Sequence, residues 1–176
     1  MEPITSEKNI DSKKTPLCIA IRNGDIVLAK SLITANTEII NSKNYKGKSP
    51  LHYAIRYNRI ECAELLIRHH ANVNFHDNEG FTALHEATTY GLTDLTKLLI
   101  ANKADVNCQN NEGYTPLHQA TSHGTAEDIE LLIANNANVN GKNIYGWTPT
   151  HWAALTGRPD SMKVLIAHNA TMHNKV

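Results

Sequence analysis

The ten residues NEGFTALHEA at positions 78–87 return as NEGYTPLHQA at positions 111–120, so nearly the same phrase recurs after 33 residues. The Thr or Ser within the phrase recurs along the whole chain, at Thr15, Ser49, Thr82, Thr115 and Thr148. The Asn that closes each unit recurs every 33 residues, at Asn41, Asn74, Asn107 and Asn140. A fixed period of this length indicates an array of stacked repeats, because no single unit can bury its own apolar face.

Each unit is predicted to be a turn followed by two short helices. The turn has Asn or Asp three residues before a glycine, which readily takes a positive φ. Thr or Ser then caps the first helix, usually with Pro at its first position. That helix should end at a residue suited to a left-handed conformation, namely Gly24, Asn58, Gly91, Gly124 or Gly157. The second helix carries an aliphatic run such as Leu98-Leu99-Ile100, and both helices are too short to be stable alone.

Composition excludes several classes of partner. The formal net charge is zero and the pI is near 7.2, which argues against a nucleic-acid or anionic-membrane binder. No apolar run approaches the roughly 18–20 residues that span a bilayer, and no apolar signal segment opens the chain. The three cysteines are widely spaced and form neither a disulfide framework nor a zinc pattern. We therefore expect an intracellular, cytoplasmic protein with no nucleic-acid and no membrane partner.

The repeated histidines are predicted to be structural. They recur with the period of the array, at His52, His85, His118 and His151. A catalytic site needs different groups that converge on one point, whereas these are the same group once per repeat. Each imidazole is expected to bond the turn backbone and the Thr or Ser of its own phrase. No nucleotide-binding, serine-hydrolase or zinc-protease motif occurs, so we expect no enzyme activity, no metal and no cofactor.

The period, the turn, the two helices and the phrases SPLHYA, TALHEA and TPLHQA resemble the ankyrin repeat over about residues 14–173. The resemblance implies an all-α solenoid of helix-turn-helix units with finger loops. It divides the chain into an N-terminal tail (1–13), five repeats (14–41, 42–74, 75–107, 108–140 and 141–173) and a C-terminal tail (174–176). The first and last repeats act as caps.

Two departures from the family pattern stand out. Ankyrin repeats usually have Gly just after the second helix, where this sequence has His70, Lys103, Asn136 and Asn169. Asp128 occupies a position that is apolar in three of the other units. Either the helix turns so that Ile129 faces the core, or Asp128 has a buried partner.

Binding is expected on the concave face, at variable positions of the fingers and first helices. The candidates are Tyr45, Lys48, Arg56, Tyr57, Phe81, Tyr90, Tyr114, His123, Tyr145 and Trp147. Phe81, Tyr114 and Trp147 follow the turn glycines and are predicted to form an aromatic ladder; the alternative is that they only pack between fingers. Along this surface, positive charge is expected at the N-terminal end and negative charge in the middle. The basic residues are Lys43, Lys46, Lys48 and Arg56, and the acidic residues are Glu79, Glu86 and Glu112.

The resemblance implies a non-catalytic protein that binds another protein as an adaptor or inhibitor, and that is a monomer in isolation. Ankyrin proteins that bacteria or viruses deliver into host cells are similar, so delivery into a host is a further expectation. The alternative is a structural subunit of a larger complex. Asn107 lies eight residues after a Leu, as in ankyrin sequences that asparaginyl hydroxylases modify, so it is a candidate for hydroxylation. Tying the turn is its other expected role.

Overall fold

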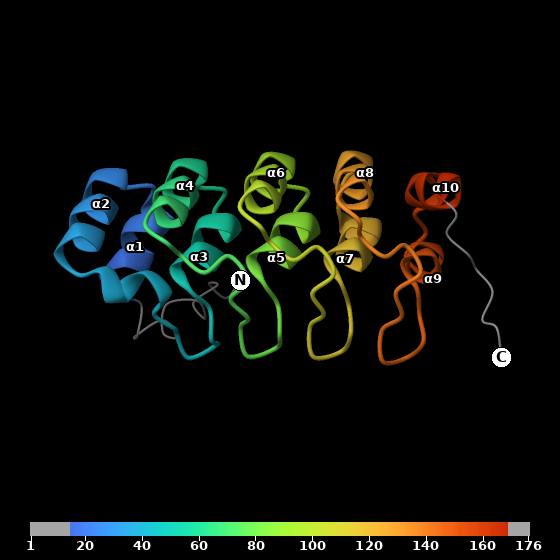
Figure 1. The fold of residues 1–176 in the computed structure, drawn as a ribbon, viewed down its shortest axis with the longest axis horizontal. Helices are drawn as coiled ribbons and strands as arrows, with labels where there is room; N and C mark the ends of the chain where they lie inside the picture. The colour runs from blue at the N-terminus through green and yellow to red at the C-terminus, as the bar shows by residue number, and fades with distance from the viewer. Residues whose placement is uncertain (1–14, 169–176) are drawn as a thin grey trace, which may run out of the picture.

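The computed structural model describes residues 15–168, and this range contains ten α-helices in five consecutive pairs and no strand (Figure 1). The inner helices are α1 (Pro16–Asn23), α3 (Pro50–Arg56), α5 (Ala83–Thr89), α7 (Pro116–His123) and α9 (Pro149–Leu155). The outer helices are α2 (Ile26–Ala35), α4 (Ile60–Arg68), α6 (Thr93–Ala101), α8 (Ala126–Ala134) and α10 (Pro159–Ala167). A short 3-10 helix, η1 (Thr37–Asn41), follows the first pair. The predicted all-α solenoid is confirmed.

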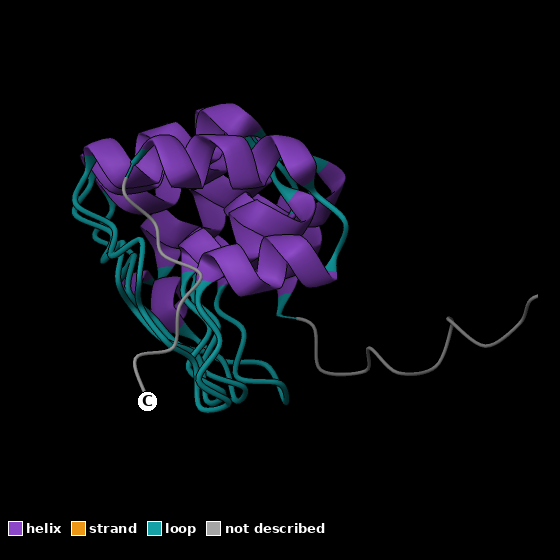
Figure 2. Ribbon diagram, turned by 90° about the vertical axis from the view of Figure 1, so that its right-hand side faces the viewer, coloured by secondary structure: helices purple, strands orange, loops and turns teal. Residues whose placement is uncertain are grey.

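The pairs stack side by side, so that the outer helices, the inner helices and the long loops form three layers. Figure 2, which looks along the array, shows an outer and an inner layer of helices, with the long loops projecting together from the inner layer. We call residues 42–48, 75–81, 108–114 and 141–147 the finger loops. The predicted tails, 1–13 and 174–176, lie outside the described residues, as do residues 169–173 of the predicted fifth repeat.

Local sequence explains where the inner helices begin. In α7, the Thr115 side chain accepts from the backbone of His118, and the His118 ring accepts from the backbone N–H of Thr115. This reciprocal capping box also opens α3, α5 and α9. It satisfies backbone donors that have no partner within the helix, and losing such a cap typically costs about 1 kcal/mol.

The inner helices end as predicted in four of five cases. Gly24, Asn58, Gly91 and Gly157 have φ between 49° and 75°. Gly124 is the exception, because its φ of −76° and ψ of −168° are extended. The missing side chain instead lets the backbone at Gly124 approach the preceding unit closely, since a Cβ there would lie 2.8 Å from the carbonyl oxygen of Thr88.

The residues that replace glycine after the outer helices keep the left-handed conformation. His70, Lys103 and Asn136 have φ of 67°, 66° and 68°. A side chain in this region is strained, least so for Asn. Asn169 lies outside the described residues.

A row of leucines runs through the core between the helix layers. Leu66, Leu99, Leu132 and Leu165 occupy equivalent places in successive outer helices, and all are fully buried. Burial of one such side chain contributes about 1.5–3 kcal/mol. None of the helices between residues 15 and 168 is long and apolar enough to cross a membrane.

At Asp128 the structure combines the two alternatives, a core position filled by Ile129 and a buried partner for the aspartate. Ile129 is fully buried and fills the core position. Asp128 is also fully buried, and its Oδ2 accepts from the Thr125 hydroxyl at 2.9 Å and from the Thr125 backbone N–H at 3.3 Å. Its second oxygen, Oδ1, has no hydrogen-bond partner. The aspartate therefore caps its own helix.

Candidate functional site

The inner face is the surface formed by the inner helices and the finger loops, and corresponding residues line up along it in rows. The row that follows the turn glycines contains Lys48, Phe81, Tyr114 and Trp147. The row on the inner helices contains Ile19, Tyr53, Glu86, Gln119 and Trp152. Two further rows lie at the ends of the inner helices. The first contains Arg22, Arg56, Thr89, Ser122 and Leu155, and the second contains Asn23, Tyr57, Tyr90, His123 and Thr156.

The repeated histidines join each unit to the next. In His85, Nδ1 lies 2.9 Å from the Thr82 hydroxyl and accepts from the Thr82 backbone N–H, as predicted for its own phrase. Its Nε2 lies 2.9 Å from the Tyr114 carbonyl oxygen, which belongs to the following finger. His52 and His118 contact the carbonyls of Phe81 and Trp147 in the same way. The expectation that the imidazole bonds the turn of its own repeat was therefore wrong, because the turn in reach is the next one.

These contacts fix each ring in one neutral tautomer. A carbonyl only accepts, so Nε2 of His85 carries the proton, and Nδ1 must accept from the backbone N–H. Burial lowers the pKa of His85 and of His118 to about 4, although the carbonyl beside each Nε2 acts in the opposite direction. Burial likewise lowers the pKa of His52. These imidazoles are structural ties that stay neutral at physiological pH.

Hydrogen bonds also join neighbouring fingers. The Asn78 side chain donates to the Tyr45 carbonyl at 3.0 Å, and Asn111 donates to the Asn78 carbonyl at 3.0 Å. The backbone N–H groups of Asn78, Asn111 and Ile144 donate to carbonyls of the preceding finger at 3.0 Å. These bonds therefore hold neighbouring finger loops together in one ordered row.

Lys48 is already paired within the molecule. Its ammonium contacts the Glu86 carboxylate and lies 3.2 Å from Asp77 Oδ2, and all three side chains are largely buried. Burial by itself lowers the pKa of Lys48, but the two carboxylates outweigh it and raise the pKa. The expected strip of surface charge is therefore wrong at Lys48 and Glu86, because an ion cluster between neighbouring units neutralises the lysine.

The aromatic side chains form a cluster at one end rather than a ladder. Tyr114 is only 7% exposed and packs against Trp152, with ring centroids 4.9 Å apart. Trp147 stacks on Trp152 at 5.6 Å, and Tyr145 contacts Trp147 at 5.8 Å. Phe81 stays apart and meets the edge of His85 at 5.5 Å. We call Tyr114, Tyr145, Trp147 and Trp152 the aromatic cluster.

Sequence reasoning missed Trp152, although the repeat held the signal. Trp152 lies at the same offset after Tyr114 as Glu86 after Lys48. In both cases the residue after a turn glycine meets the inner helix of the next unit. Little of Tyr114 is left for a partner, so its main contact is with Trp152.

Other predicted residues do face solvent. Tyr45, Tyr90 and Tyr145 are 52%, 49% and 56% exposed, and Arg56 and His123 are exposed as well. Tyr57 is half-buried and stacks on Tyr53 with centroids 6.2 Å apart. The inner face thus brings large aromatic surfaces and one guanidinium to solvent, the residue types that dominate protein interfaces.

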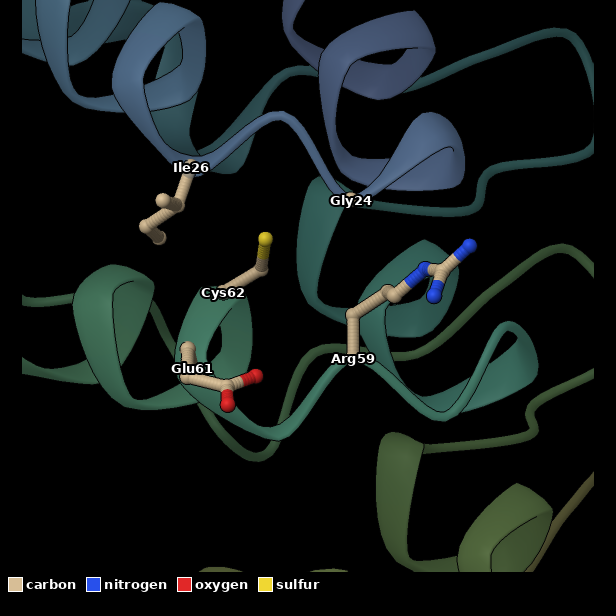
Figure 3. A pocket seen from close by; sticks show the side chains of 5 residues that line it. All are labelled: Gly24, Ile26, Arg59, Glu61 and Cys62. Atoms are coloured by element: carbon tan, nitrogen blue, oxygen red, sulfur yellow. The ribbon is translucent and has the colours of Figure 1, made fainter.

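A pocket elsewhere offers no catalytic arrangement. It lies between the first two helix pairs and is lined by Gly24, Ile26, Arg59, Glu61 and Cys62 (Figure 3). The Arg59 guanidinium donates to the Arg22 carbonyl at 2.9 Å, so it holds the two units together. Burial raises the pKa of the Cys62 thiol, which keeps it protonated and unreactive. Within residues 15–168, no group of His, Cys, Asp and Glu could hold a metal ion.

Asn107 ties adjacent units. Its side-chain amide donates to the Asn136 carbonyl at 2.9 Å, and its Oδ1 accepts from the Asn138 backbone N–H at 2.8 Å. Asn74 makes the equivalent pair of bonds one unit earlier. Hydroxylation of Asn107 stays a prediction from the family resemblance.

Comparison with known families agrees with this geometry. A family model described as ankyrin repeats (3 copies) matches residues 3–77 and again residues 84–175, which together are most of the chain. Ankyrin repeats are generally protein–protein interaction modules and typically non-catalytic. With its capped helix pairs, stacked fingers and repeated histidine ties, the chain belongs to the ankyrin-repeat family.

Proposed function

We propose that this protein binds a partner protein through the inner face and the finger tips, without catalysing a reaction. The observation that carries the proposal is that Tyr45, Tyr90, Tyr145 and Trp147 expose large aromatic surface on a face whose fingers are hydrogen-bonded to one another. An ordered aromatic surface loses little conformational entropy on binding, which favours affinity.

The mode of action we propose is that of an adaptor or inhibitor in the cytoplasm, of the cell that makes the protein or of a host. Two sets of buried side chains support this, because their ionisable groups are already paired or hydrogen-bonded within the array. Lys48, Asp77 and Glu86 form one such set, and His85 with Thr82 forms another. Binding would therefore act by occupying or bridging a partner surface.

Cross-linking in cell extract tests the proposal. A photoreactive amino acid is placed at Tyr90 or Tyr145 on the inner face, and at Val27 or Ile166 elsewhere as controls, since all four side chains are well exposed. The proposal expects specific partner adducts from the inner-face positions and few from the controls. Equal adducts from all four positions, or adducts from the controls alone, would contradict it. A stoichiometric partner that co-purifies through every step would indicate a structural subunit instead.

A further inference from the structure

The two ends of the inner face differ in chemistry. The row at the helix ends begins with Arg22 and Arg56 and finishes with Leu155. Arg56 is exposed and Arg22 is half-buried, and neither guanidinium has a hydrogen-bond or ion-pair partner among the described residues. The nearby Lys48 is neutralised by Glu86 and so does not compete for an anion. The two guanidiniums thus form an unpaired basic end.

The opposite end is apolar. Leu155 is 65% exposed, and the same end carries Ile144 at 65%, Tyr145 at 56% and Trp147 at 38%. Trp147 is held by stacking on Trp152, so its exposed surface is positioned rather than loose. A bulky apolar side chain of a partner that packs here would remove apolar surface from water on both proteins. Such burial contributes about 25 cal/mol of binding free energy per Å².

The stretch between the two ends is polar and holds free hydrogen-bonding groups. The Thr89 hydroxyl donates to the His85 carbonyl and lies 3.3 Å from one end of the Gln119 side-chain amide, whose other end has no partner within the described residues. The exposed Tyr90 side chain lies in the same stretch. An extended peptide has unpaired backbone N–H and carbonyl groups that such side chains can satisfy, whereas a helix has already paired its own. The middle of the face therefore favours an extended chain.

We propose that the inner face binds an extended segment of the partner that carries an acidic side chain over Arg22 and Arg56 and a bulky apolar side chain over Trp147 and Leu155. This inference rests on the proposed function and specifies its partner. Arg56 and Leu155 are three units apart, or roughly 30 Å if helices stack at their ~10 Å diameter. An extended chain rises about 3.3 Å per residue, so the acidic and apolar side chains should be about nine residues apart. A helical segment would need about twenty residues.

Peptide selection tests the spacing. The purified full-length chain is used to select binders from a displayed library of random peptides long enough to span the face and lacking tryptophan. Enriched peptides should pair Asp or Glu with Leu, Ile, Met or Phe about nine positions apart. The chain has two tryptophans, and both lie in the aromatic cluster. Titrating the strongest synthetic peptide should therefore shift tryptophan emission to shorter wavelength as the indoles are covered.

Paired variants separate the two ends. Leu155→Ala should weaken binding of the selected peptide by at least about tenfold, whereas Ile166→Ala, on an outer helix and also well exposed, should change it less than about twofold. Arg56→Ala should weaken it about fivefold and flatten its salt dependence. The control Arg68→Ala removes an equally charged side chain from outer helix α4. Melting temperatures of all variants are measured first, to show that each one folds.

Three results would overturn the inference: no enriched peptide, enriched peptides without the acidic and apolar pair, or equal affinity for Arg56→Ala and Arg68→Ala. The cross-linking experiment separates this failure from failure of the proposed function. Adducts on the inner face together with a failed peptide selection would mean that a partner binds there with different chemistry. Adducts that map only to Val27 or Ile166 would overturn both.

Discussion

Mild acid should destabilise this array, because the histidine ties work only when the rings are neutral. Protonation of His85 or His118 puts a second N–H on the ring, facing a backbone N–H that donates to Nδ1. Two donors would then face each other in a buried site, and among the described residues no carboxylate forms an ion pair with either charged ring, although Asp77 favours the charge on His85 from a distance. Unfolding the chain relieves both problems, since the ring is then solvated.

The magnitude follows from the difference between the folded and unfolded pKa values. The pKa of each ring is about 4 in the folded chain and 6.5 when unfolded, so the unfolded state binds more protons between these values. The stability that each neutral ring contributes is complete above pH 6.5 and is lost as the pH falls towards 4. At about pH 5, each of the two rings should lower the free energy of unfolding by about 2 kcal/mol.

Urea unfolding followed by circular dichroism at about pH 7.5 and about pH 5 measures this loss. The variant His118→Gln should be less stable at the higher pH but should lose about 2 kcal/mol less on acidification, because one titrating ring is gone. His151→Gln is the matched control, since His151 keeps the bond to Thr148 but has no acceptor for Nε2 among the described residues. An unfolding midpoint that does not move with pH, or an equal acid loss in His118→Gln and the native chain, would refute the reasoning.

Three further predictions concern stability. Lys48→Met should cost about 3 kcal/mol in urea unfolding, because Glu86 would stay buried and charged without its partner; no loss would mean that the carboxylate reaches water. Lys103→Gly should stabilise by up to about 1 kcal/mol, because it relieves a φ of 66°, and a thermal melt without gain would contradict this. Gly124→Ala should lower the melting temperature despite the extended φ, because its Cβ would press on the Thr88 carbonyl; an unchanged melt would show that the backbone yields.

The features that sequence predicts well are those encoded within one unit. Thr115 and His118 lie three residues apart, so the phrase alone specifies the capping box. The turn glycines and the helix ends follow from local conformational preferences, and four of the five ends are as predicted. Gly124 differs because a Cβ there would press both on the Ala120 backbone of its own helix and on the Thr88 carbonyl, which belongs to another unit.

Contacts between units were harder to predict. Phe81, Tyr114 and Trp147 were expected to stack from finger to finger, but Phe81 and Trp147 contact rings of their own unit, and Tyr114, like Lys48, meets the inner helix of the next unit. That offset places Lys48 beside Glu86 and Tyr114 beside Trp152. A side chain's partner depends on how far each unit is rotated and shifted against its neighbour, and the period of the sequence does not contain this information. The binding role of the exposed residues stays a prediction.

The bonds between units fall into two kinds, with different consequences for evolution. The histidine-to-carbonyl tie and the asparagine bridge end on backbone groups, which every residue type provides. A duplicated or deleted unit would find the same acceptor at each new junction, so these bonds permit changes in array length. The pairing of Lys48 with Glu86 is specific to its junction, and shuffling the order of the units would leave a buried charge unmatched. The backbone ties thus let the array grow, while the side-chain pairs fix the order of its parts.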